Sequence, residues 1–115
     1  MKPIIVVSSL ICNLFSVFIK VGGITLYPFI ILRPEYDNKI TINHEKIHIE
    51  QQKELLVVFF YVLYVYYWIK GKVSGLSNEA AYMSIPFEKE AYDNQHDMEY
   101  LEQRKKNSWL SYKID

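Results

Sequence analysis

The residues of this chain best suited to chemistry are His44, Glu45 and His48, which form the pattern H-E-x-x-H. On an α-helix, a spacing of four residues places two side chains one turn apart on the same face, so both imidazoles can bind one metal ion. A zinc ion held by two neutral imidazoles and a carboxylate keeps a fourth position for water, and a neighbouring carboxylate such as Glu45 can take a proton from that water. The pattern therefore predicts a hydrolytic metal centre.

The segment around the motif indicates a helix that begins close to it. Thr41 or Asn43 can cap the N-terminus, and the charges of Glu45 and Glu50 favour the positive end of the helix dipole. No glycine or proline occurs over residues 43–70, which predicts one helix about 42 Å long. We therefore expect both histidines in its first turns. The alternative is a solvated first turn that binds no metal.

The second part of that helix, residues 55–69, is apolar or aromatic on every side. Such a segment rises about 22 Å, which is less than the roughly 30 Å hydrocarbon core of a membrane. Burial in the protein core is therefore the simplest expectation. Tyr67 and Trp68 beside Lys70 are also typical of a segment at a membrane interface, and burial between two copies of the chain is a further alternative.

The chain before the motif is expected to form strands and one helix. Residues 24–33 are apolar on both alternating faces and predict a strand, in which Pro28 requires a sheet edge or a bulge. An edge strand beside a metal site can pair with an extended peptide substrate, or it can simply cover the core. Residues 3–7 predict another strand, 9–20 a helix, and 39–42 a short additional strand.

The chain after the apolar segment predicts two further helices. Residues 71–75 indicate a turn, and residues 77–82 a short capped helix. Pro86 suits the first turn of a second helix, which we expect to continue to about Lys106. The tail with Trp109, Leu110 and Tyr112 is expected to pack back on the core.

A third metal ligand is expected from this last helix, because two histidines alone bind zinc loosely. Glu90, Asp93 and Asn94 share one of its faces. We expect Glu90 to bind the metal, and Asn94 or Asp93 to support a ligand by hydrogen bonding. Glu88 and Glu79 are the alternatives for the third ligand.

The H-E-x-x-H at 44–48 and the glutamate on a later helix resemble the two halves of a gluzincin zinc peptidase. The small size and the order of a strand followed by two helices are similar to the minimal members of that clan, the minigluzincins. The resemblance implies Zn²⁺ as cofactor and a peptide or protein as substrate. It also implies three zinc ligands, His44, His48 and Glu90, and Glu45 as the general base and acid.

The expected fold is a single zincin-like α+β domain over residues 1–115. A small sheet with an apolar edge strand packs on the long H-E-x-x-H helix and on the C-terminal helix that carries the glutamate. His96, Tyr92 or Tyr82 could polarise the scissile carbonyl. Two other classes of function stay open: a catalytically idle zinc protein, and a membrane-surface or assembly protein that uses residues 55–69.

The overall composition argues against some classes of function. The chain has 13 basic and 13 acidic residues, so we expect no nucleic-acid partner. The single Cys12 cannot form an internal disulfide, which fits an intracellular, reducing compartment. No small-residue cleavage site follows the apolar N-terminal segment, so we expect no secretion signal. Half of the residues are hydrophobic, which is enough for apolar surface to stay outside a small core and to reach a membrane surface or a second copy of the chain.

Overall fold

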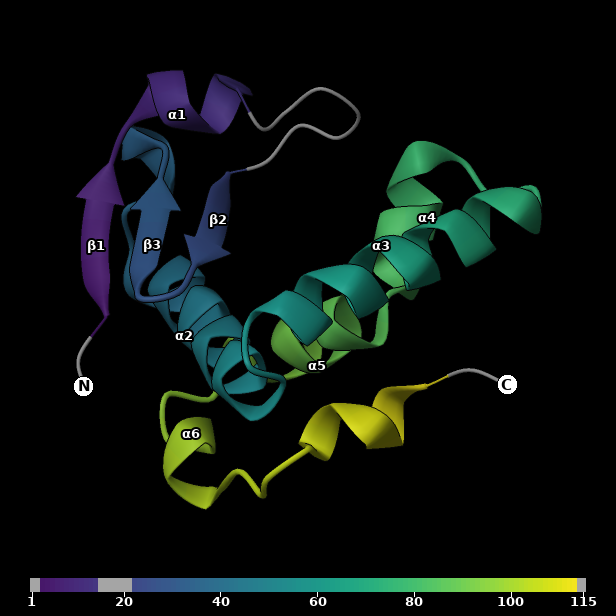
Figure 1. The fold of residues 1–115 in the computed structure, drawn as a ribbon. Helices are drawn as coiled ribbons and strands as arrows, with labels where there is room; N and C mark the ends of the chain where they lie inside the picture. Colours follow the sequence, from purple (N-terminus) through teal and green to yellow (C-terminus); the bar gives the residue numbers. More distant parts are fainter. Residues whose placement is uncertain (1–2, 15–21, 114–115) are drawn as a thin grey trace.

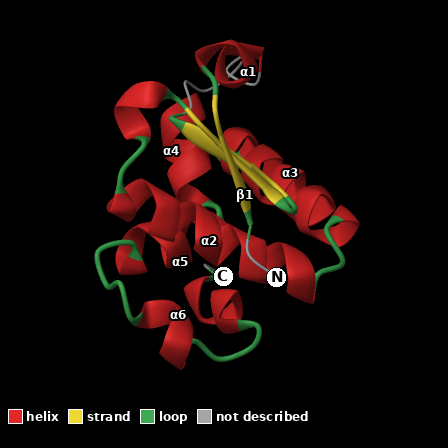
Figure 2. Cartoon of the chain, turned by 90° about the vertical axis from the view of Figure 1, so that its left-hand side faces the viewer, coloured by secondary structure: helices red, strands yellow, loops and turns green. Residues whose placement is uncertain are grey.

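The computed structural model of the chain describes residues 3–14 and 22–113. These residues form an α+β fold, as predicted, with a small three-stranded sheet at one end and helices making up the rest (Figure 1). The sheet lies in front of the helices in Figure 2. The helix that carries the H-E-x-x-H motif packs against this sheet.

The sheet contains β1 (Ile4–Val7), β2 (Gly23–Leu26) and β3 (Phe29–Leu32) in the order β1-β3-β2. β1 runs parallel to β3, and β2 runs antiparallel to it. The single strand predicted over 24–33 is wrong, because Tyr27 and Pro28 form a turn between two strands. The predicted strand over 3–7 is confirmed as β1. The predicted edge position holds for β2 alone, because β3, which follows Pro28, is the central strand.

The first helix, α1 (Ser9–Leu14), begins where the sequence predicts. The remainder of the predicted helix over 9–20 lies outside the described residues. Cys12 is the buried residue of α1, and burial raises the pKa of its thiol. This helix belongs to the packing around β3.

The motif helix, α2 (Lys39–Glu54), begins earlier than predicted. Its N-cap is Asn38, whose side chain accepts a hydrogen bond from the backbone N–H of Thr41 at 2.9 Å. Thr41 and Asn43 are therefore not the caps, and the short strand predicted over 39–42 is wrong. With this cap in place, the first turn ends before the motif, so the histidines lie in the second and third turns, where tertiary packing buries them.

The long helix predicted over 43–70 is also wrong, because it is broken between α2 and α3 (Val58–Val73). The two helices are bent by 113°. A straight helix of about 42 Å would exceed the longest dimension of the fold, 35 Å, and would hold much of its apolar surface away from the core. No single helix among the described residues is long and apolar enough to cross a membrane; only the bent pair of α2 and α3 passes that test together.

The break between α2 and α3 strains the backbone. Val57 has φ 62° and ψ −58°, and the N–H of Val58 donates to the carbonyl of Leu56 at 2.6 Å. This is the geometry of a γ-turn that L residues seldom adopt. We expect Val57→Gly to raise the free energy of unfolding by about 1 kcal/mol, since the relief of strain exceeds the entropy cost of glycine.

Thermal denaturation of the purified variant tests this expectation, with a rise in Tm of about 4 °C. Val62→Gly is the matched control, because the same replacement inside α3 should lower the free energy of unfolding by about 1 kcal/mol. A Val57→Gly variant that is less stable than the wild type would contradict the strain assigned to this turn.

A cluster of buried aromatic and aliphatic side chains joins α3 to the C-terminal half of the chain. Phe60 packs with Ile85, Phe87 and Trp109. Trp109 is buried in a short 3₁₀ segment, Ser108–Tyr112, with its ring 4.7 Å from that of Phe87. The predicted return of the tail to the core is therefore confirmed for Trp109, whereas the prediction is wrong for Leu110, which is 49% exposed.

The remaining helices are α4 (Asn78–Ser84), α5 (Pro86–Asn94) and α6 (Tyr100–Gln103). The short helix predicted at 77–82 is confirmed as α4, with Ser77 as its N-cap. The helix predicted from Pro86 to about Lys106 ends at Asn94. The reason lies in α2, where the buried Asn43 amide donates to the carbonyls of Gln95 at 2.9 Å and Asp97 at 3.0 Å, so these carbonyls do not continue a helix.

Candidate metal centre

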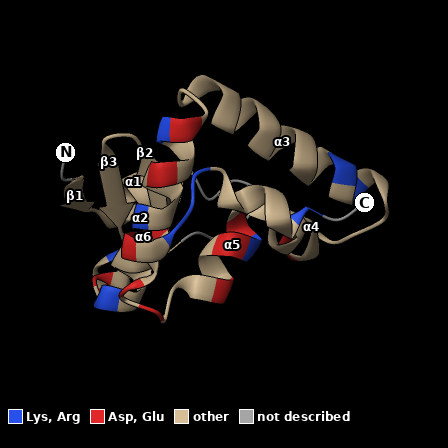
Figure 3. Ribbon diagram, turned by 90° about the horizontal axis from the view of Figure 1, so that it is seen from below, with Lys and Arg blue, Asp and Glu red and all other residues tan. Residues whose placement is uncertain are grey.

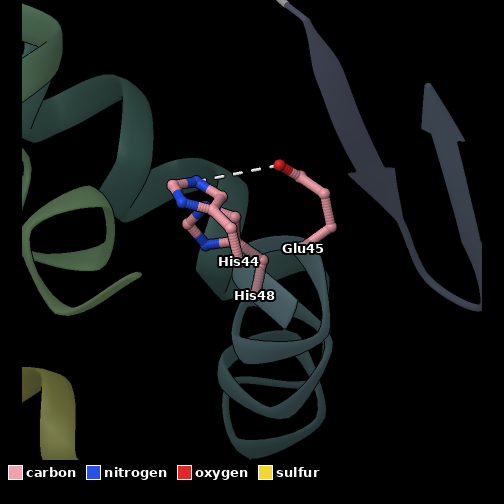
Figure 4. Close-up of side chains that lie close together, drawn as sticks. All are labelled: His44, Glu45 and His48. Carbon is pink, nitrogen blue, oxygen red and sulfur yellow. Dashed lines mark ion pairs between the residues drawn. The ribbon is translucent and has the colours of Figure 1, made fainter. Parts of the chain in front are cut away.

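The three motif side chains converge on one buried point beside the sheet. His44, Glu45 and His48 each offer a ligand atom within 4.8 Å of the other two. Figure 4 shows the two imidazoles side by side and the Glu45 carboxylate directed toward His44; the distance from Glu45 Oε2 to His44 Nε2 is 3.7 Å. This buried group can bind a metal ion, as the spacing of the motif predicts.

A second carboxylate reaches the same point from α5. Glu88 Oε1 lies 3.1 Å from His44 Nε2 and 3.1 Å from His48 Nε2. Glu88 is buried in the first turn of α5. Glu88 occupies the position predicted for Glu90, while the other alternative, Glu79, is exposed on α4.

Glu90 faces away from the imidazoles, because it follows Glu88 by two residues, and side chains two residues apart on a helix point about 200° apart around its axis. Its carboxylate is fully buried and accepts hydrogen bonds from Tyr100 at 2.6 Å, Arg104 at 2.5 Å and Gln51 at 2.9 Å. Arg104 also pairs with Glu54 of α2 at 2.6 Å. The expected ligand role of Glu90 is corrected accordingly: it joins α5 and the C-terminal segment to α2.

Amide oxygens behind the two imidazoles determine which ring nitrogen carries the proton in the neutral form. His44 Nδ1 lies 2.9 Å from Gln95 Oε1, and His48 Nδ1 lies 2.7 Å from Gln51 Oε1. The Gln51 amide cannot be reversed, because its nitrogen donates to Phe87 O and to Glu90. Amide oxygens only accept hydrogen bonds, so each Nδ1 carries a proton and each Nε2 is directed at Glu88.

This arrangement of donors fits a bound cation. In their neutral form, both imidazoles direct Nε2 lone pairs at a carboxylate oxygen, and three acceptors that meet in a buried site repel one another. A proton or a metal ion between them removes this repulsion. Imidazole nitrogen and carboxylate oxygen are ligands of zinc, so the residues present fit the metal that the motif predicts.

The electrostatics of the site favour positive charge. Burial disfavours protonation of His48, but the Glu88 carboxylate outweighs burial and raises the pKa of His48 to about 9. Burial also disfavours the ionised form of Glu88, yet His48 and His44 hold the pKa of this carboxyl well below its usual range. Glu88 is therefore anionic beside the two rings and can bind a cation together with them.

Two side chains from other elements fix the carboxylates of the site. Thr25 of the edge strand β2 donates its hydroxyl to Glu45 Oε1 at 2.8 Å, which leaves Oε2 on the side of the histidines. Tyr64 of α3 donates to Glu88 Oε2 at 2.7 Å, which leaves Oε1 for the imidazoles. Each carboxylate thus keeps one oxygen for chemistry at the centre.

A cavity of about 560 Å³ opens beside these groups. Glu45, His48 and Glu88 form its polar end. The rest of its wall comes mostly from β2 and α3 and, apart from Thr25 and Gln52, is apolar or aromatic; it includes Ile24, Leu26, Tyr61, Val65 and Trp68. A ligand in this cavity would therefore meet the candidate metal centre at one end and apolar side chains along its length.

Tyr82 and Tyr92, two of the candidates for carbonyl polarisation, lie near the centre. Tyr82 lines the cavity, and its hydroxyl is 3.1 Å from that of Tyr92. The Tyr92 ring is 4.4 Å from the His44 ring. Burial and the charge of Glu88 raise the pKa of Tyr82, which keeps its hydroxyl neutral and able to donate a hydrogen bond.

The other predicted supporting residues are farther from the imidazoles. His96 is exposed and lies 3.4 Å from the Gln95 amide nitrogen, so it meets the His44 ring only through Gln95. Asn94 donates to the carbonyl of Glu90 at 2.8 Å and to the Tyr112 hydroxyl at 2.9 Å, which ties α5 to the tail. Asp93 is exposed.

Sequence reasoning missed the residues that orient the ligands. Gln51 follows His48 by three positions on the same helix, a spacing that brings two side chains together and could have identified it. Thr25, Tyr64 and Gln95 reach the centre from distant parts of the chain, and no local pattern marks them. Their roles come from tertiary packing.

No protein family, curated protein or solved structure matches this chain. The case for its function therefore depends on the geometry of its own residues. The proposal depends on four buried side chains that converge on one point: His44, Glu45, His48 and Glu88.

Proposed function

We propose that the chain is a zinc-dependent metallopeptidase with a zincin-like centre of the gluzincin type. The observation that carries this proposal is the position of Glu88 Oε1, 3.1 Å from Nε2 of both His44 and His48, next to a second, differently held carboxylate. Two imidazoles and one carboxylate are a ligand set used by catalytic zinc sites. Glu88 would be the third ligand, in place of Glu90.

The proposed mechanism gives each residue of the centre one task. Zinc supplies Lewis acidity toward a carbonyl group and makes water more acidic. Glu45 accepts a proton from the attacking water and returns it to the leaving amine. Thr25 holds Glu45 by one oxygen, so that the other is free for this transfer, and the neutral Tyr82 hydroxyl donates toward the negative charge that develops on the carbonyl oxygen.

The surroundings of the centre support an extended peptide as substrate. β2 is an edge strand. Its Thr25 carbonyl already accepts hydrogen bonds from Gln52 and Tyr61, and the Tyr27 N–H that follows it donates to Gln52. A peptide that adds to the sheet would therefore pair with the first part of β2. β2 also lines the cavity that contains Glu45. Because most of the remaining wall is apolar or aromatic, a large apolar side chain near the scissile bond fits this cavity best.

Metal content and chelation test the proposal. We expect about one zinc per chain by elemental analysis, and no zinc above the buffer background in His48→Ala. The wild type should cleave an unfolded, fluorescently labelled casein, lose this activity with phenanthroline and regain it with zinc chloride. A protein that binds no zinc would contradict the proposal. Bound zinc without cleavage of casein or of a peptide library would favour the idle zinc protein instead.

A further inference from the structure

Helix α3 carries a continuous apolar face that residues 3–14 and 22–113 leave largely exposed. Seven large apolar side chains of α3 are between 49% and 82% exposed. They are Val58, Phe59, Val62, Val65, Tyr66, Ile69 and Val73. Their spacings of three and four residues place them on one side of the helix, and Figure 3 shows α3 along one border of the molecule.

The opposite side of α3 is firmly packed. Phe60 is buried in the core, and Tyr64, Tyr67 and Trp68 pack around it. The helix is therefore held in place by half of its circumference, and the exposure of the other half follows from how the fold positions it. An apolar face of this length on one helix marks an interaction site.

The charges near this face indicate what it meets. The sequence has no acidic residue between Glu54 and Glu79, and the charged residues of α3 are Lys70 and Lys72 at its C-terminal end (Figure 3). Successive residues are about 100° apart around a helix, so these two lysines border the apolar face on opposite sides. Lysines beside an apolar helix face are typical of helices that lie on anionic membranes.

A second copy of the chain fits this face less well. Between two copies, Lys70 and Lys72 would meet a face without acidic residues, because none occurs between Glu54 and Glu79. An anionic lipid surface supplies the opposite charge, since an amphipathic helix binds it through its buried apolar face and its basic residues.

We propose that α3 docks this face on an anionic lipid surface, with Lys70 and Lys72 at the headgroups. Leu56, which is 72% exposed at the bend before α3, extends the apolar contact. Val65 belongs to the exposed face and also to the wall of the cavity. Docking therefore brings the cavity next to the lipid, where, on the proposed function, it would receive peptide segments at the membrane surface.

Vesicle flotation tests the docking with the full chain. Vesicles of phosphatidylcholine with phosphatidylglycerol should bind the wild type, and Val62→Glu/Ile69→Glu should lower the binding at least about tenfold, because two apolar side chains leave the contact. Leu10→Glu/Leu14→Glu is the matched control: it adds the same charge at exposed leucines of α1 and should bind as the wild type does.

The two lysines are tested separately. Lys70→Gln/Lys72→Gln should reduce binding to the anionic vesicles about tenfold at low salt and leave the weak binding to pure phosphatidylcholine unchanged. Equal flotation of the wild type and Val62→Glu/Ile69→Glu would overturn the proposal, as would loss of binding only in the α1 control. A stable dimer that Val62→Glu/Ile69→Glu dissociates, with no vesicle binding, would assign the face to a second copy.

These results do not depend on the metal centre. Val62 and Ile69 are not among the residues that line the cavity, so the double variant should keep the zinc content of the wild type and its activity on casein in solution. If the double variant loses flotation but keeps the zinc content of the wild type, the docking is supported whatever the enzyme assay gives. If the wild type floats with the vesicles but contains no zinc, only the proposed function is contradicted.

Discussion

Replacement of Glu45 by glutamine is expected to lower peptide turnover by about 10²- to 10⁴-fold, the range that a positioned general base contributes. Glutamine has nearly the same shape, and its amide oxygen can still accept the hydrogen bond from Thr25. It cannot accept the proton of the attacking water. Because His44, His48 and Glu88 are unchanged, the zinc content should also be unchanged.

Turnover and zinc content should be measured on the same samples. Glu50→Gln is the matched control, since Glu50 lies on the same helix and pairs with Lys53 at the surface; its turnover should equal that of the wild type. Equal hydrolysis by Glu45→Gln and the wild type would show that another group removes the proton.

Replacement of Glu88 by glutamine is expected to reduce the zinc affinity by more than about 100-fold. Loss of a residue that only hydrogen-bonds to a metal ligand costs up to about 100-fold in affinity, and loss of a ligand itself should cost more. Glu88 contributes the one negative charge that lies 3.1 Å from both imidazoles. A neutral amide is a much weaker zinc ligand, and its NH₂ group cannot bind the metal at all.

Glu90→Gln is the control that separates the two glutamates of α5. It removes a charge that faces Arg104, so it should lower the Tm of the metal-free protein. Its effect on the zinc affinity should be smaller, a loss of about 10- to 100-fold, because Glu90 supports His48 only through Gln51. Competition with a chromophoric chelator measures the affinities. A larger loss of zinc in Glu90→Gln than in Glu88→Gln would restore Glu90 as the ligand.

The geometry of the motif followed from the sequence because it is local. A spacing of four residues on a helix fixes the two imidazoles on one face, and the structure brings them together with Glu45. The caps and turns predicted from nearby residues succeeded where one strong signal acted alone, as for Ser77 before α4. They failed at α2, where Asn38 competed with Thr41 and Asn43 for the same role.

The choice between Glu88 and Glu90 shows where local signals end. Both are glutamates near the start of the same predicted helix, so the sequence does not show which one binds the metal. Burial does not separate them either, because both are buried. The rotation of α5 about its axis separates them. This rotation is fixed by the packing of Phe87 in the core and by the ion pair between Glu90 and Arg104. Side chains from β2, α3 and the C-terminal segment then complete the centre.

The sequence by itself determined the class of fold, the helical motif and the apolar character of residues 55–69. Only the tertiary structure decided which carboxylate faces the imidazoles, where the long apolar segment bends, and which of its sides stays exposed. The physical reason is that helix periodicity is a property of neighbouring residues, whereas the rotation and the bend of a helix depend on contacts with residues far away in the chain.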